Sequence, residues 1–307
     1  MAYYRDIILE PGEHGDKAVY EGRTRLLLQA GEHRFPRLFT GTTVIMPAGG
    51  VGRWEASVNS EFGRVAIAQG DRGTLDVRGL MIRSGLHGIK AQGLLRASGC
   101  LFYGCALQGI QSNFGRARIM HNWFIRCGFA RRWEHCCYLY GPGNILFNNI
   151  FENPGYLALT FPRATSNYAA GGGWVSRNLM HVGGANRLYP GLVEVSDPTR
   201  TVFVWNTIQG TVICGGQSGK TDSCTRIGPS NLTMDTLTPN AYPFVSQRNG
   251  IYWLHRPLPR PAGCYPYDAR RTHQHALKLY RSGYMGIAFG KIVRPVLPTD
   301  TWDLEAT

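Results

Sequence analysis

A short phrase recurs six times between residues 74 and 210, and this repeat limits the possible folds more than any other feature of the chain. The phrase is marked by Gly79, Gly99, Asn122, Asn149, Asn178 and Asn206. The markers are 20, 23, 27, 29 and 28 residues apart, which is the range of repeat architectures. The residues two positions before and two positions after the markers are almost all apolar, and so are those four positions before, where Arg118 is the one exception.

This alternation with period two predicts one half-buried strand in each repeat. A unit with a single short strand cannot bury its apolar side alone, whereas repeats stacked on one another bury it as a continuous column. A second strand is expected in each repeat, since two strands are the fewest that close a coil. The candidates are residues 87–91, 107–111, 136–140, 157–161 and 192–196. The sequence therefore predicts an all-β parallel β-helix.

The markers suit tight bends, because Gly lacks a Cβ and Asn tolerates left-handed backbone. Phrases such as NILFNNIFEN at residues 144–153 resemble the right-handed parallel β-helix superfamily of pectate-lyase-like proteins. The resemblance covers roughly half of the chain well, in line with a fold-level match. It implies a single-stranded right-handed solenoid with capping segments at both ends. Members of this superfamily include polysaccharide lyases and tail-spike-like proteins of virus particles.

Three regions follow from the repeat and its edges. Residues 1–41 are expected to form an N-terminal cap and entry strand, residues 42–240 the β-helix, and residues 241–307 a C-terminal extension rich in Pro and aromatic residues. Within that extension, residues 268–282 fit one amphipathic helix. Early strands are expected at residues 42–47 and 65–68. Hydrophobic residues make up 43% of the chain, which is typical of a folded protein.

The charge balance, 33 Lys and Arg against 20 Asp and Glu, favours polyanionic partners. Acidic polysaccharide is expected first. Nucleic acid ranks last, because the chain has no zinc finger, no RNP-type strand and no long basic run. The eight cysteines have no zinc or CxxC spacing, so free core thiols are expected. No apolar run approaches the length of a membrane span, and the first residues do not resemble a secretory signal.

The repeats lengthen toward the C-terminus, and extra residues in a solenoid must leave it as loops, which are often functional. Three such loops, at residues 129–135, 162–173 and 183–190, combine Arg with aromatic residues. Guanidinium groups pair with carboxylates and aromatic rings stack on sugars. The expected binding residues for an acidic glycan are Arg131, Arg132, Trp133, Arg163, Tyr168, Arg187, Tyr189 and Glu194. The alternative is that these side chains only cover the flank of the coil.

Two functions remain open. The first is a structural or receptor-binding component of a virus particle, tail-spike-like and trimeric, that binds and cleaves acidic surface polysaccharide. The second is a stand-alone lyase that acts on a uronate-containing glycan by β-elimination, which needs a base for the C5 proton. The candidate bases are Lys90, His135, Tyr138, Tyr140 and His181, and Lys90, Tyr138, Tyr140 and Glu194 are expected to share one face. No metal or cofactor is expected, since the central repeats hold few carboxylates.

Overall fold

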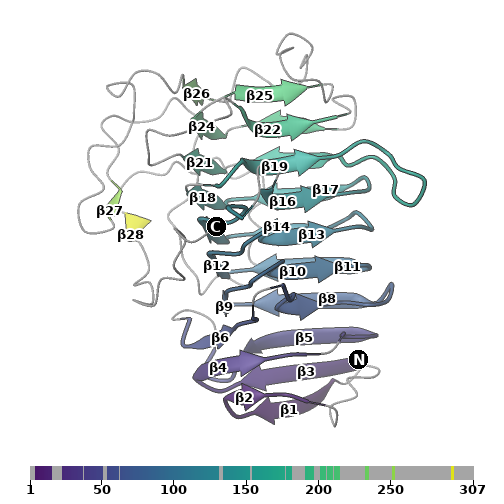
Figure 1. Ribbon diagram of the computed structural model, residues 1–307, viewed down its shortest axis with the longest axis vertical. Helices are drawn as coiled ribbons and strands as arrows, with labels where there is room; N and C mark the ends of the chain where they lie inside the picture. Colours follow the sequence, from purple (N-terminus) through teal and green to yellow (C-terminus); the bar gives the residue numbers. More distant parts are fainter. Residues whose placement is uncertain are drawn as a thin grey trace.

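The structure is a computed structural model. It describes residues 4–15, 23–36, 38–50, 54–61, 63–130, 134–152, 154–176, 178–181, 191–196, 201–204, 206–209, 211–214, 232–234, 251–252 and 292–293. In these ranges every regular element is a β-strand and none is a helix. Nearly all of the strands belong to three long parallel sheets, which Figure 1 shows stacked from the N-terminal strands upward.

Each of the three sheets takes its strands from successive turns of the chain. The nine-stranded sheet contains β1 (Arg5–Leu9), β3 (Arg23–Leu28), β5 (Thr42–Pro47), β8 (Thr74–Arg78), β11 (Leu94–Ser98), β14 (Arg118–Met120), β17 (Asn144–Phe147), β20 (Gly173–Ser176) and β23 (Val202–Val204). The ten-stranded sheet contains β2 (Gly12–Glu13), β4 (Gly31–Arg34), β6 (Ala56–Val58), β9 (Met81–Ile82), β12 (Leu101–Tyr103), β15 (Trp123–Ile125), β18 (Ile150–Glu152), β21 (Leu179–His181), β24 (Thr207–Gln209) and β26 (Leu232–Met234).

The seven-stranded sheet contains β7 (Ile67–Ala68), β10 (Ile89–Ala91), β13 (Ile110–Ser112), β16 (His135–Leu139), β19 (Leu157–Phe161), β22 (Gly191–Val195) and β25 (Thr211–Cys214). A separate antiparallel pair joins β27 (Ile251–Tyr252) to β28 (Ile292–Val293). From β5 to β25 the chain visits the nine-, ten- and seven-stranded sheets in that fixed order. This arrangement is compatible with a parallel β-helix.

Each turn from β5 onward has three strands, one more than the two expected. The recurring phrase is two strands rather than one: it leaves the nine-stranded sheet, bends near the marker and enters the ten-stranded sheet. The periodicity does not reveal the bend, because the alternation of apolar residues continues across it. The second strand candidates form the seven-stranded sheet, and the one at residues 157–161 has the bounds of β19.

The expected alignment of the repeats is wrong by one residue in the first two turns. Leu101 pairs with Met81 on one side and with Trp123, not Phe124, on the other, so the position equivalent to Asn122 is Cys100 rather than Gly99. The left-handed bend lies one residue earlier, at Gly79, Gly99, His121 and Asn148, with φ between 54° and 65°. The pattern places Gly and Asn at one equivalent position, whereas in the structure they occupy two. Gly79 and Gly99 lie at the bend, and the marker asparagines follow it. With the corrected register, Arg118 pairs with Arg96 and Ile145, so it is no longer an exception in an otherwise apolar column.

The four marker asparagines form a buried ladder of amide side chains. The Nδ2 atoms of Asn122, Asn149 and Asn178 each donate to the Oδ1 atom of the next Asn, at 3.1, 2.9 and 3.0 Å. Each Oδ1 atom also accepts the backbone N–H of the preceding marker, and Asn206 lies at the end of the series. All four side chains are buried. The ladder satisfies backbone groups that the bend takes out of the sheets.

The core between the sheets contains side chains that repeat from turn to turn. Phe102, Phe124 and Phe151 stack with ring centroids 4.6 and 4.8 Å apart and planes 6° from parallel. The cysteines whose side chains the structure describes are buried and free, which confirms the expectation of core thiols for these five: Cys100, Cys105, Cys127, Cys136 and Cys137. Their burial removes the need for a disulfide framework.

Of the two early strands expected, the one at residues 42–47 is present with those bounds, and the one at residues 65–68 is shorter, at residues 67–68. The boundaries at residues 41 and 240 stay predictions, although β1 to β4 already belong to the large sheets. The helix expected at residues 268–282 lies outside the described residues. The described part of the chain holds no helical segment with the length and hydropathy of a membrane span.

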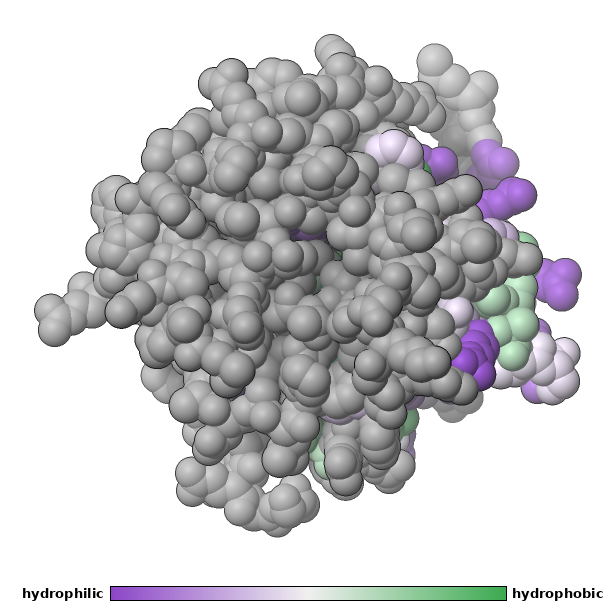
Figure 2. All heavy atoms as spheres, turned by 90° about the horizontal axis from the view of Figure 1, so that it is seen from above, coloured by the Kyte–Doolittle hydropathy of each residue, from purple (hydrophilic) through white to green (hydrophobic). Residues whose placement is uncertain are grey.

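The surface of the described residues combines hydrophilic and hydrophobic side chains, as the view from above shows (Figure 2). Large hydrophobic residues exposed among them are Tyr4, Ile8, Leu38 and Phe114. These residues belong to different parts of the sequence. The segment between β19 and β20, residues 162–172, leaves the stack as a long loop (Figure 1), in agreement with the second of the three expected loops.

Candidate functional site

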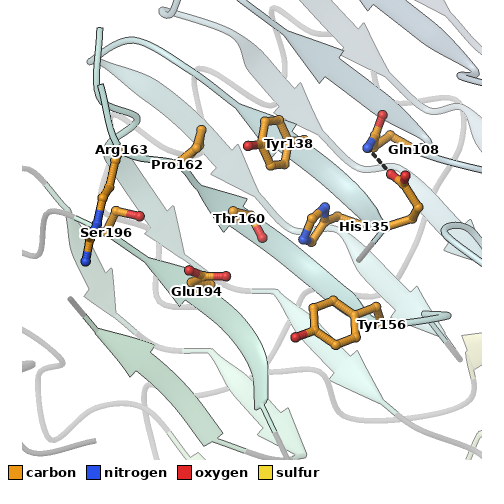
Figure 3. A pocket seen from close by; sticks show the side chains of 10 residues that line it. Gln108, His135, Tyr138, Tyr156, Thr160, Pro162, Arg163, Glu194 and Ser196 are labelled. Atoms are coloured by element: carbon orange, nitrogen blue, oxygen red, sulfur yellow. Dashed lines mark hydrogen bonds between the residues drawn. The ribbon is translucent and has the colours of Figure 1, made fainter. Parts of the chain in front are cut away.

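A pocket of about 490 Å³ opens on the outer face of the seven-stranded sheet. Its walls come from turns that are far apart in sequence and adjacent in the stack (Figure 3). The lining residues are Gln108, Glu134, His135, Tyr138, Tyr156, Thr160, Pro162, Arg163, Glu194 and Ser196. The pocket therefore combines aromatic, acidic, basic and hydroxyl side chains.

The register of the seven-stranded sheet explains why these side chains meet. Side chains alternate between the two faces of a strand, and the inward positions of β10 to β22 hold apolar residues such as Ile89 and Leu159. The outward column between them runs through Lys90, Gln111, Tyr138, Thr160 and Glu194. Parallel in-register strands place this column about 4.8 Å apart per step. The last three members line the pocket.

His135, at the start of β16, is one of the most buried lining residues, with 6% of its surface exposed. Burial lowers the pKa of its imidazole to about 3, because removal from water disfavours the charged form. The ring packs against Tyr138 and Tyr156, with centroids 5.1 and 5.8 Å away. His135 is therefore neutral near pH 7 and held in place by aromatic contacts.

Burial shifts the pKa of Tyr138 in the opposite direction to that of His135. Burial raises the pKa of its phenol, and the hydroxyl of Tyr140 and the carboxylates of Glu194 and Glu134 raise it further. The two hydroxyl oxygens are 3.4 Å apart. The Tyr140 ring also packs against Tyr168, at 4.8 Å between centroids. Tyr138 therefore stays protonated near pH 7 and can donate a hydrogen bond to a ligand.

Two carboxylates lie at opposite sides of the pocket. Burial raises the pKa of Glu194, and the smaller effect of Arg163 lowers it. Glu134 accepts a hydrogen bond from the Nε2 atom of Gln108, drawn as a dashed line in Figure 3. Arg163 and Ser196 lie together at the Glu194 side, whereas Gln108 and His135 lie at the Glu134 side. The pocket thus has a side with a guanidinium group and a side without one.

The structure brings together four of the residues expected from sequence: His135, Tyr138, Arg163 and Glu194. Tyr140 and Tyr168 lie beside the pocket through their ring contacts. Lys90 shares the outward column, two strands away from Tyr138. Three of the four residues expected on one face, Lys90, Tyr138 and Glu194, therefore lie in one column, and Tyr140 follows the end of β16 with its ring against Tyr138. His181 is in β21 of the ten-stranded sheet, apart from the sheet that forms the pocket.

Five expected binding residues lie outside the described residues, namely Arg131, Arg132, Trp133, Arg187 and Tyr189. Six lining residues are not among the expected site residues: Gln108, Glu134, Tyr156, Thr160, Pro162 and Ser196. Gln108 and Tyr156 precede strands of the seven-stranded sheet: Gln108 stands two before Ile110, and Tyr156 one before Leu157. A register alignment of that sheet would have found them, because Ile110 pairs with Cys137 and Leu157 with His135.

The chemistry available at the pocket is hydrogen bonding, ring stacking and one ionic contact. Among the described residues, no group of three or more His, Cys, Asp or Glu is placed to hold a metal ion. Aromatic rings with polar edges and a few converging polar groups are typical of a ligand pocket. Because the pocket opens on the side of the stack, it can hold a segment of a longer ligand chain.

Comparison with protein-family models, with curated proteins and with solved structures found no match for this chain.

Proposed function

We propose that this chain is a right-handed parallel β-helix that binds acidic polysaccharide in the pocket of the seven-stranded sheet, as a structural or receptor-binding component of a virus particle. The observation that carries the binding proposal is the pocket itself, where Tyr138, Tyr156 and Arg163 converge on the outer face of a regular sheet. Tyrosine rings present flat faces for sugar stacking, and a guanidinium group pairs with a carboxylate through two hydrogen bonds.

The proposal of a continuous right-handed coil rests on the order in which the chain passes through its three sheets. Three strands per turn, each paired in parallel with its equivalents in the turns before and after, suit a continuous coil. Right-handed crossover is the rule for parallel strands in one sheet. A stiff coil of this kind suits a particle component, because each turn is held by two neighbours.

The alternative is a polysaccharide lyase. The protonation states of two candidate bases, His135 and Tyr138, favour binding over cleavage. A general base works best with a pKa near the working pH. Burial lowers the pKa of His135 to about 3, which makes it a weak base, and the raised pKa of Tyr138 keeps its phenol from acting as one. Tyr138 is better suited to donate a proton or a hydrogen bond. Cleavage would require that the bound ligand shift the pKa of His135 or Tyr138 toward the working pH.

Calorimetric titration of the protein with oligogalacturonate and oligoalginate tests the binding proposal. We expect binding to at least one of them, and Arg163→Gln should weaken it by about 10- to 100-fold, since a charge-assisted hydrogen bond is worth about 1.5–3 kcal/mol. Arg96→Gln is the matched control, because Arg96 is exposed on the nine-stranded sheet. Absence of binding, or equal losses in both variants, would contradict the proposal.

Two further measurements separate the alternatives. Ultraviolet absorbance of the same mixtures reports the unsaturated uronate that β-elimination forms, and a steady rise that Tyr138→Phe abolishes would favour the lyase. Light scattering reports the mass in solution. A stable trimer that binds glycan without releasing product would favour the particle component, whereas a monomer with lyase activity would favour the stand-alone enzyme.

A further inference from the structure

Three pocket-lining residues each have one buried polar atom without a hydrogen-bond partner among the described residues: the Oε1 atom of Gln108, the Nδ1 atom of His135 and the Oγ1 atom of Thr160. His135 and Thr160 are the more deeply buried, with 6% and 3% of their surface exposed, and both point into the pocket in Figure 3. Buried polar groups are nearly always paired in folded proteins. These unpaired groups in one pocket therefore indicate a ligand that completes their hydrogen bonds.

The surroundings define the charge of the group that fits there. His135 is neutral, so it brings no positive charge to this part of the pocket. Glu134 precedes His135 in the chain, and Glu194 is paired with Thr160 across the adjacent strands, a spacing of about 4.8 Å. Both side chains are acidic and line the pocket. An anionic ligand group at His135 and Thr160 would meet like charges on both sides.

The hydrogen-bonding capacity of the two atoms defines the group further. A threonine hydroxyl donates one hydrogen bond and accepts others, and a nitrogen of neutral imidazole either donates or accepts. A hydroxyl group does both, so it matches either tautomer of His135. Carboxylates and phosphates accept only, and ammonium groups donate only. An uncharged group that both donates and accepts, such as a sugar hydroxyl, satisfies this site in every case.

We propose that His135 and Thr160 form a subsite for the hydroxyl groups of an uncharged sugar face, and that the carboxylate of an acidic unit lies at the Arg163 side. This inference rests on the proposed function, because it describes how the glycan lies in the same pocket. It divides the pocket into a hydroxyl side and a carboxylate side. The glycan is then held in one direction across the seven-stranded sheet.

The test uses Thr160→Val, which keeps the shape of the side chain and removes the hydroxyl. We expect affinity for the oligogalacturonate or oligoalginate that the protein binds to fall about tenfold, while the melting temperature rises. Thr43→Val is the matched control: its Oγ1 atom is also buried without a partner, with 1% of the residue exposed, but it lies in β5 of another sheet. Thr43→Val should raise the melting temperature and leave affinity unchanged.

Carboxyl-reduced forms of the same oligosaccharides test the division of the pocket. Reduction should weaken binding to the natural protein and have little effect on Arg163→Gln, whereas the loss caused by Thr160→Val should be the same for both forms. Thr160→Ser, which keeps the hydroxyl, should bind within about threefold of the natural protein. This variant serves if Thr160→Val does not fold.

The outcomes separate the inference from the function beneath it. Unchanged affinity in Thr160→Val, with binding to the natural protein intact, would overturn the hydroxyl subsite and leave glycan binding standing. A loss in Thr160→Val that occurs with the acidic form alone would overturn the placement of the carboxylate. Failure of the natural protein to bind any of these glycans would overturn the proposed function and this inference together.

Discussion

At the scale of single residues, burial decides the chemistry of the pocket more than residue type does. His135 and Tyr138 are three positions apart in β16, and the same loss of water moves their pKa values in opposite directions. The reason is that burial disfavours whichever form is charged, imidazolium in one case and phenolate in the other. Both side chains are therefore neutral over a wide pH range.

Burial of His135 predicts a pH-dependent contribution of this residue to stability, beside that of His87, whose pKa burial lowers to about 4. Between about pH 6.5 and pH 3 the unfolded chain binds a proton that the folded His135 does not, so stability falls as pH falls through that window. His135→Gln should reduce the loss of unfolding free energy between pH 7 and pH 5 by about 2 kcal/mol. Denaturant unfolding at both values measures it. The interval from pH 7 to pH 8 is the control, where natural and variant proteins should change alike.

At the scale of elements, the asparagine ladder is the device that lets the chain bend between two sheets. Asn149 accepts hydrogen bonds from the backbone and side chain of Asn122 and donates to Asn178 and to the carbonyl oxygen of Ile119. Every polar atom of its amide thus has a partner. The ladder is also why Asn marks the later repeats at nearly equal intervals.

Asn149→Asp should therefore destabilise the fold strongly although the side chain keeps its size. The new oxygen would face two acceptors, the Oδ1 atom of Asn178 and the carbonyl oxygen of Ile119, so one oxygen of a buried carboxylate would have no donor, and we expect a loss of about 3–5 kcal/mol. Chemical denaturation measures this loss. The corresponding change at Asn167, exposed in the loop after β19, should stay within about 0.5 kcal/mol. Similar effects at both positions would contradict the ladder's role.

The phenylalanine stack is the apolar counterpart of the ladder. Phe124 lies between Phe102 and Phe151 in parallel contact and is fully buried. Phe124→Ala should cost about 3–5 kcal/mol, since it removes core contacts on two sides and leaves a cavity. Phe114→Ala, at a residue that is 40% exposed, should cost far less. A melting-temperature shift of equal size in the two variants would show that the stack contributes little.

At the scale of the whole molecule, stability is expected to vary along the stack. Turns in the middle have a neighbour on each side, whereas β1 pairs only with β3. Ile8 in β1 is 63% exposed, and Ile7 and Leu9 are only partly buried against the core. Repeat architectures lose structure first where a neighbour is missing. The N-terminal strand is therefore expected to be less stable than the inner strands of the described stack.

Hydrogen exchange should reveal this gradient. Amides of β1 should exchange faster than amides of β14, because local opening of an end strand exposes less apolar surface than opening of an inner one. The comparison is made under native conditions at one pH, so intrinsic exchange rates cancel after correction for sequence. Equal protection in the two strands would indicate that the stack opens only as a unit.

The sequence by itself determined the parallel repeat and the alternation that turns Tyr138 and Glu194 to one face, because side-chain alternation and repeat spacing are local properties that a linear pattern records. Only the tertiary structure decided the rest. Register between turns corrected the one-residue slip at Gly79 and Gly99, since hydrogen bonding and not residue type fixes which positions pair. Stacking brought Gln108 and Tyr156 to one pocket with Arg163. Burial there set the pKa values and left His135 and Thr160 unpaired, and burial arises only when distant turns pack together.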